Sequence, residues 1–106
     1  MAEDLIARYT AMVAKSPKNE LARFSLAKAL FDAGRFEEAG DAFRWCVQKK
    51  TDWMVPAIMI GRCQLQLGDA AAARVSLEKA RQLAIEQHHE GPLEEINGLL
   101  ASIHPS

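Results

Sequence analysis

The sequence has little of what marks several large classes of protein. Its two cysteines, Cys46 and Cys63, are too few for a disulfide scaffold and do not form a metal-binding C-x-x-C pair. No basic partner for a nucleophile is signalled, so both are interpreted as buried structural thiols. The longest apolar run, 53–60, is far shorter than the ~20 residues that span a bilayer. Acids stand near the start where a signal peptide needs positive charge, so we expect a soluble, cytoplasmic protein.

An excess of charge of one sign is also missing. The 13 Lys and Arg residues are scattered among 14 Asp and Glu residues, which gives a net charge of −1. Such a chain presents no basic field that would attract nucleic acid or an anionic membrane. We therefore expect neither as a partner.

The sequence shows no arrangement that is typical of an enzyme. Paired carboxylates in an apolar setting, a glycine-rich phosphate loop and a Ser–His arrangement are all missing, so neither catalysis nor a cofactor is predicted. His88, His89 and Glu90, with His104 as a third imidazole, invite a metal site or a metal-dependent enzyme. Adjacent histidines point about 100° apart on a helix, so a solvated helix end is the preferred interpretation and no metal is predicted.

The sequence does contain an internal repeat. Residues 34 positions apart match one another: Leu26 with Ile60, Gly34 with Gly68, and Phe43 with Leu77. The match also extends backwards, because Leu5, Tyr9 and Met12 precede Ala39, Phe43 and Cys46 by the same interval. A fixed period of this length predicts one supersecondary unit that buries its apolar faces against copies of itself.

Hydrophobic spacing of three to four residues predicts that each unit consists of two helices. The expected helices lie near 3–16, 19–33, 36–50, 54–67 and 70–88, followed by a capping helix near 92–103 that Pro92 opens. Gly34 and Gly68 are expected to end helices in the left-handed conformation, and Asp69 to cap the next helix. The buried stripe of the first helix is predicted to be Leu5, Tyr9, Met12 and Val13. The apolar line of the capping helix is predicted to be Leu93, Ile96, Leu100 and Ile103.

These units resemble the tetratricopeptide repeat (TPR), whose pattern is W-x₂-L-G-x₂-Y, then A-x₃-F, A and P. The opening slots are filled by Arg23, Leu26, Ala27 and Leu30 in one copy and by Ala57, Ile60, Gly61 and Gln64 in the other. The second half of the TPR pattern is filled by Ala39, Phe43 and Cys46 in one copy and by Ala73, Leu77 and Ala80 in the other. Pro17 fills the position of the final Pro. The small residues Ala39 and Ala73 would let the two helices of a unit approach closely. The resemblance implies an all-α, right-handed superhelix of antiparallel helix pairs. It also implies one domain, 1–106, divided into a half repeat 3–19, repeats 20–53 and 54–87, and a cap 88–106.

The resemblance further implies a concave groove, lined by the first helix of each unit, that binds peptides. The corresponding positions are Leu21, Phe24, Lys28, Phe31 and Asp32 in one unit and Val55, Ile58, Arg62, Leu65 and Gln66 in the other. On a helical wheel the first set lies opposite the core stripe, so these side chains either form a surface or are covered by the end helices. Phe24, Lys28 and Arg62 are expected to be exposed. The Lys and Asn clamp by which some family members grip chaperone tails is not kept, because Phe24, Lys28 and Met59 stand in its place.

The function predicted from the resemblance is that of a non-catalytic adaptor or scaffold that binds a short peptide segment of a partner protein. Lys28 and Arg62 would take an acidic group of that peptide; alternatively, Lys28 pairs with Asp32 and Arg62 is solvated. A structural self-association module is the alternative function, with the groove or the Trp45 face buried in a homo-oligomer. Trp53 is expected to cover the junction between the two repeats.

Overall fold

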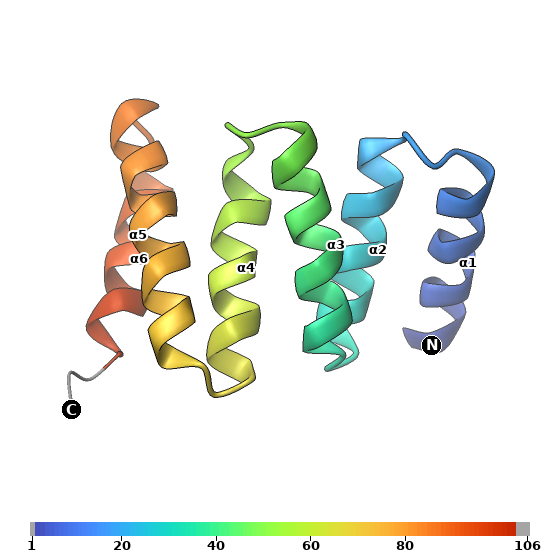
Figure 1. The fold of residues 1–106 in the computed structure, drawn as a ribbon, viewed down its shortest axis with the longest axis horizontal. Helices are drawn as coiled ribbons and strands as arrows, with labels where there is room; N and C mark the ends of the chain where they lie inside the picture. Colours follow the sequence, from blue (N-terminus) through green and yellow to red (C-terminus); the bar gives the residue numbers. More distant parts are fainter. Residues whose placement is uncertain (1, 104–106) are drawn as a thin grey trace.

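The computed structural model describes residues 2–103, and these residues form six α-helices and no strand (Figure 1). Each helix packs against the next in antiparallel order, as expected from the short connections. The helices are α1 (Ala2–Lys15), α2 (Glu20–Asp32), α3 (Phe36–Lys49), α4 (Met54–Gln66), α5 (Ala70–Glu86) and α6 (Glu90–Ala101). The predicted all-α fold is confirmed. Among the described residues, no helix has the length and apolar content needed to cross a membrane.

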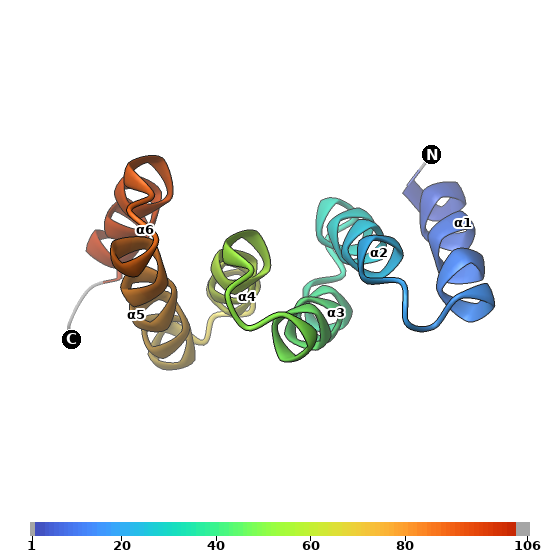
Figure 2. The ribbon, with the colours of Figure 1, turned by 90° about the horizontal axis from the view of Figure 1, so that it is seen from above.

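Figure 2 shows how the helices divide into two layers. Helices α2, α4 and α6 lie on one side of the molecule, and α3 and α5 lie on the other. We call α2 with α3 the first unit and α4 with α5 the second unit. The molecule is a slab of 41 × 28 × 19 Å, so every helix keeps one side toward solvent.

Predicted helix ends agree with the structure to within two residues. The side chains of Asn19 and Asp69 cap α2 and α5 by accepting hydrogen bonds from the backbone N–H groups of Ala22 and Ala72, each at 3.1 Å. Deviations of two residues occur at the end of α5 and at both ends of α6, which begins at Glu90, two residues before the predicted start at Pro92. Proline is tolerated there because the first N–H groups of a helix have no intrahelical partner.

Three helices of the chain end with a residue in the left-handed conformation. Gly34 and Gly68 take it at φ 80° after α2 and α4, as predicted. After α5 the same position is occupied by His88, at φ 56°. His88 N–H donates to the carbonyl of Ile85 at 3.2 Å, just as Gly68 N–H donates to the carbonyl of Leu65 at 3.1 Å. A side chain with a Cβ is therefore held in the conformation that glycine takes after α2 and α4.

Replacing His88 with glycine is expected to raise the free energy of unfolding by about 1 kcal/mol, because the left-handed conformation is unfavourable for a residue with a Cβ. Urea denaturation measures the change. The matched control is His89→Gly, since His89 has an ordinary φ of −95° and should gain nothing from the replacement. Equal gains in both variants would show that the conformation at His88 is not strained.

The core consists of two adjoining clusters, one in each unit. Phe43 and Leu77, which are equivalent in the repeat, lie fully buried at their centres. Ala39 and Ala73 are also fully buried, as predicted. The first cluster contains Ile6, Ala27, Ala29, Leu30, Ala39, Ala42, Phe43 and Cys63. The second contains Met54, Ala57, Ile58, Ala73, Leu77, Ala80, Ala84, Ile96 and Ile103.

Gly61 allows the closest approach within the second unit. A Cβ placed on Gly61 would lie 2.6 Å from Cδ2 and 2.7 Å from Cγ of Leu77, which is well inside van der Waals contact. The equivalent residue in the first unit is Ala27, which is fully buried. The second unit therefore has the glycine that the TPR pattern calls for, and Leu77 fills the space where its side chain would be.

The stripe predicted for the first helix is wrong at two positions. Leu5 and Met12 are each 44% exposed, and the buried side chain of α1 is instead Ile6. The reason is that α1 packs chiefly against α2, with no helix before it among the described residues. The equivalents of Leu5 and Met12 in the first unit, Ala39 and Cys46, belong to α3, which has α2 on one side and α4 on the other.

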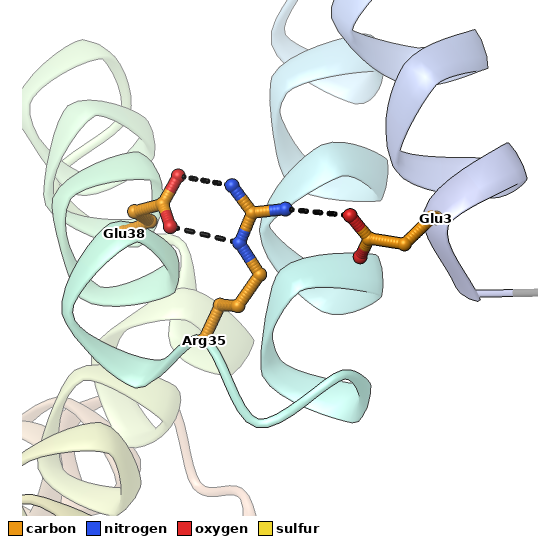
Figure 3. A network of polar contacts seen from close by, with 3 residues as sticks. All are labelled: Glu3, Arg35 and Glu38. Carbon is orange, nitrogen blue, oxygen red and sulfur yellow. Dashed lines mark hydrogen bonds and ion pairs between the residues drawn. The ribbon is translucent and has the colours of Figure 1, made fainter.

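A surface network of charges attaches the start of α1 to the first unit (Figure 3). Arg35 precedes α3, and its Nε and Nη2 atoms each lie 2.8 Å from a carboxylate oxygen of Glu38. Its Nη1 atom lies 3.2 Å from a carboxylate oxygen of Glu3 on α1. Hydrogen bonding to Arg35 lowers the pKa of Glu38. One guanidinium thus connects two helices that are not consecutive in the chain.

Candidate functional site

The face formed by the first helices carries exposed apolar side chains at repeating positions. Leu21 is 70% exposed and Val55 is 48% exposed. Each is the second residue of its helix, Leu21 in α2 and Val55 in α4, and they lie one repeat apart. Exposed apolar residues placed in register on neighbouring helices form a surface suited to an apolar ligand.

Phe24 is half-buried rather than exposed as expected. Its ring stacks on Trp53 with centroids 5.0 Å apart and meets Phe43 edge-on at 5.9 Å. Trp53 stands at the N-cap of α4, so this pair covers the junction between the two units, as predicted for Trp53. Phe24 therefore supports the surface mainly through its contacts with α3 and α4.

Three other apolar positions of the predicted groove are partly or fully buried. The structure places Ile58 in the core with 4% exposed, so its side chain does not reach the surface to which it was assigned. Phe31 is half-buried against Phe36, with ring centroids 5.1 Å apart. Leu65 is half-buried against the second core cluster, whereas Gln66 is exposed.

The two predicted cations have different surroundings. Arg62 donates to the carboxylate of Glu95 on α6, with Nε 3.0 Å from Oε2, a partner that neither expected alternative included. This ion pair ties α6 to α4. Lys28 is exposed, and within residues 2–103 it makes no ion pair; the expected pairing with Asp32 is not formed.

A hollow of about 280 Å³ lies beside Lys28, between α1 and α2. It combines the ammonium group of Lys28 with the hydroxyls of Tyr9 and Ser25, and its other lining residues are Leu5, Ala29 and Asp32. Such a set can hold a carboxylate beside apolar surface. Tyr9, Ser25 and Leu5 were not assigned to the site from the sequence. Tyr9 and Leu5 had been placed in a buried stripe, although their position on a terminal helix was a signal that they could be open to solvent.

The thiols and histidines give no reactive centre. Cys46 and Cys63 are buried, and desolvation raises the pKa of each thiol to about 11, so both are protonated near neutral pH and unsuited to nucleophilic attack. His88 and His89 border a hollow of about 200 Å³. Within residues 2–103, no three His, Cys, Asp or Glu side chains are placed to hold a metal ion, and His104 lies outside the described residues.

Trp45 is half-buried on the other side of the first unit. The guanidinium carbon of Arg23 lies 4.3 Å from its ring centroid, and Nζ of Lys49 lies 5.5 Å from it. Both cations belong to the same chain, and together they cover much of the ring that was considered as a contact for a partner or a second copy.

Comparison with known proteins finds similarity to the TPR family. A TPR repeat-containing protein of Pseudomonas aeruginosa is 34% identical to this chain over 68 residues, which make up 64% of this chain. The chain is similar in sequence to a TPR repeat protein. The match spans 65% of the P. aeruginosa protein, slightly less than two thirds of its length. No protein-family model matches the chain.

Solved TPR structures share the fold. PcrH of P. aeruginosa, in complex with the chaperone binding region of PopD, superposes with a TM-score of 0.87 and 20% identity, covering 96% of this chain and 77% of PcrH. The TPR2B domain of yeast Sti1, in complex with pHsp70, superposes with a TM-score of 0.84 and 22% identity, covering 94% of this chain and 80% of that one. At these identities the likeness concerns the TPR fold, and both relatives were solved with a segment of a partner protein.

Proposed function

We propose that this TPR-like protein is a non-catalytic adaptor that binds a short, extended segment of a partner protein on the face formed by α2 and α4. The observation that carries the proposal is the pair of exposed apolar side chains, Leu21 and Val55, one repeat apart. Lys28, two turns after Leu21 on α2, makes no ion pair within residues 2–103. The segments bound by PcrH and the Sti1 domain support this function by analogy of fold.

The charges indicate which end of the face takes an acidic group. Arg62 is already neutralised by Glu95, and a ligand would have to replace that ion pair to use it. A ligand that binds Lys28 would not have to replace an ion pair within residues 2–103. Tyr9 and Ser25 offer hydroxyl donors in the same hollow. We therefore place the carboxylate of the ligand between α1 and α2, and its apolar side chains against Leu21 and Val55. Because this surface is short, we expect a Kd on the order of micromolar for the bound segment.

The test uses a partner recovered with the native protein, from which the bound segment is synthesised and labelled. Fluorescence anisotropy then gives Kd for the native chain and for Lys28→Glu, which is expected to weaken binding at least tenfold. Lys49→Glu is the matched control, because it makes the same charge change on α3, at an exposed position that lines neither the hollow beside Lys28 nor the hollow bounded by α3, α4 and α5. If the segment binds Lys28→Glu and Leu21→Ala as tightly as the native chain, the face of α2 and α4 is not the site.

Self-association on the same surface is the second candidate, favoured by the exposure of Leu21. Analytical ultracentrifugation separates it from the first. A dimer that Leu21→Ala dissociates would support self-association, whereas a monomer that binds the labelled segment supports the adaptor.

A further inference from the structure

A larger hollow lies on the opposite side of α4. It has a volume of about 420 Å³ and is bounded by α3, α4 and α5, with α3 and α5 flanking α4 in Figure 1. At 100° per residue, its α4 residues Ala57, Ile60 and Gln64 lie roughly opposite Val55 and Arg62 on the helix. The hollow is therefore separate from the face proposed above, and its volume falls in the range of about 300–1,000 Å³ that is usual for ligand sites.

We call this hollow the rear hollow, and the charged side chains among the described residues that line it are all positive. Apolar side chains form part of its lining, together with the uncharged polar residues Gln48, Thr51, Gln64 and Ser76. Two cations, Arg44 on α3 and Lys79 on α5, also line it. None of the described residues that line it is acidic. The apolar lining consists of Val47, Ala57, Ile60, Ala80 and Leu83.

The donors at the edge are only partly used within the chain. Asp41, which does not line the hollow, accepts from one terminal nitrogen of Arg44 at 2.7 Å and leaves Nε and the other terminal nitrogen available. Ser76 donates its hydroxyl to the side-chain oxygen of Gln64 at 2.6 Å, which leaves the amide N–H₂ of Gln64 to donate elsewhere. Lys79 is exposed and makes no ion pair within the described part of the chain.

The equivalent place in the first unit shows that these features are not a general property of the repeat. There a hollow of about 560 Å³ is bordered by Trp45 where the second unit has Lys79, and by Arg23 where it has Ala57. Arg23 lies over the ring of Trp45, and Glu38 and Asp41 add negative charge. In place of the stacked pair, the second unit has Ala57 and Lys79, a cation that makes no ion pair within residues 2–103, so the apolar side chains of its hollow are not covered by a ring.

We propose that the rear hollow is a second peptide-binding site, specific for a partner segment in which one large apolar side chain is flanked by acidic residues. The apolar side chain enters between α3 and α5 and contacts Ile60 and Leu83. One flanking carboxylate pairs with Lys79, and the other accepts from the nitrogens of Arg44 that Asp41 leaves unused. Lys79 is the main source of charge preference, which favours such a segment over a neutral or basic one. This site does not depend on the face of α2 and α4.

The experiment titrates the ¹⁵N-labelled protein with the blocked tripeptide acetyl-Glu-Leu-Glu-amide and follows backbone amide shifts. We expect saturable shifts at Val47, Ile60 and Leu83. Two blocked control peptides, acetyl-Glu-Gly-Glu-amide and acetyl-Lys-Leu-Lys-amide, remove the apolar side chain or reverse the charge. Each control should bind at least fivefold more weakly.

Two variants assign the site. Lys79→Glu should weaken the binding of acetyl-Glu-Leu-Glu-amide at least fivefold, whereas Lys18→Glu, the same change in the exposed turn between α1 and α2, should leave it unaltered. Lys79 is exposed, and thermal melts of both variants verify that each remains folded. Shifts that map to α1 and α2, equal losses in the two variants, or shifts that do not saturate would each overturn the proposal. None of these results bears on whether the face of α2 and α4 binds its own partner, which the labelled segment tests.

Discussion

Replacing Ile96 with alanine is expected to lower the free energy of unfolding by about 2–5 kcal/mol, the range for deleting a buried aliphatic side chain from a core. Ile96 is the fully buried residue of α6 and packs in the second core cluster with Leu77 and Ala84. Its loss removes apolar contact and loosens the helix that covers the end of the second unit. Urea denaturation monitored by circular dichroism measures the change.

The matched control is Ile85→Ala on α5, the same chemical change at an exposed position. It should alter the free energy of unfolding by less than about 1 kcal/mol, as surface substitutions usually do. If the two variants lose equal stability, α6 does not cover the core as the structure shows.

Replacing Gly61 with alanine is expected to destabilise the fold, although alanine is the better helix former. The gain from helix propensity is about 0.5–1 kcal/mol. The added methyl would lie 2.6 Å from Leu77, whose side chain is fully buried. Overpacking of this kind costs about 1–3 kcal/mol, so the unfavourable contribution is the larger one.

Gly98→Ala on α6 supplies the control, because a Cβ there meets nothing within 4 Å. The same substitution should therefore stabilise the protein by about 0.5–1 kcal/mol. A double-mutant cycle adds a second criterion: Leu77→Val should be less damaging in the Gly61→Ala background, since it makes room for the methyl. Stabilisation by Gly61→Ala would mean that α4 and α5 lie farther apart than the structure shows.

Much of the fold could be predicted because its determinants are local. The period of 34 residues, the turn glycines Gly34 and Gly68 and the spacing of apolar residues predicted every helix to within two residues at each end. The deviation of two residues at the C-terminal end of α5 also has a local cause. His88 takes the conformation of a turn glycine without being one, so no residue type marked the turn.

The candidate site was less predictable because exposure depends on neighbours that the pattern does not specify. A helical wheel gives the direction of Ile58 but not that the core of the second unit encloses it. Arg62 pairs with Glu95, 33 residues away in the chain, once α6 folds back on α4. Leu5 opens to solvent since α1 lacks a helix on its outer side within the described residues. The roles of Leu21, Lys28 and Val55 in binding stay predictions.

The limited burial of α1 has a consequence for how the hollow beside Lys28 forms. One side chain of α1 is buried, compared with five residues of α3, and the Arg35 network that fastens its first turn is exposed to solvent. In a linear array, the terminal helix with the fewest buried contacts is the first to open, so its amides should exchange hydrogen with water sooner than those of α3. When α1 separates from α2, Leu5 and Tyr9 move away from Lys28 and the hollow between the two helices is lost. A peptide that needs this hollow binds only the closed form, and occupancy would be visible as slower amide exchange at the N-terminus.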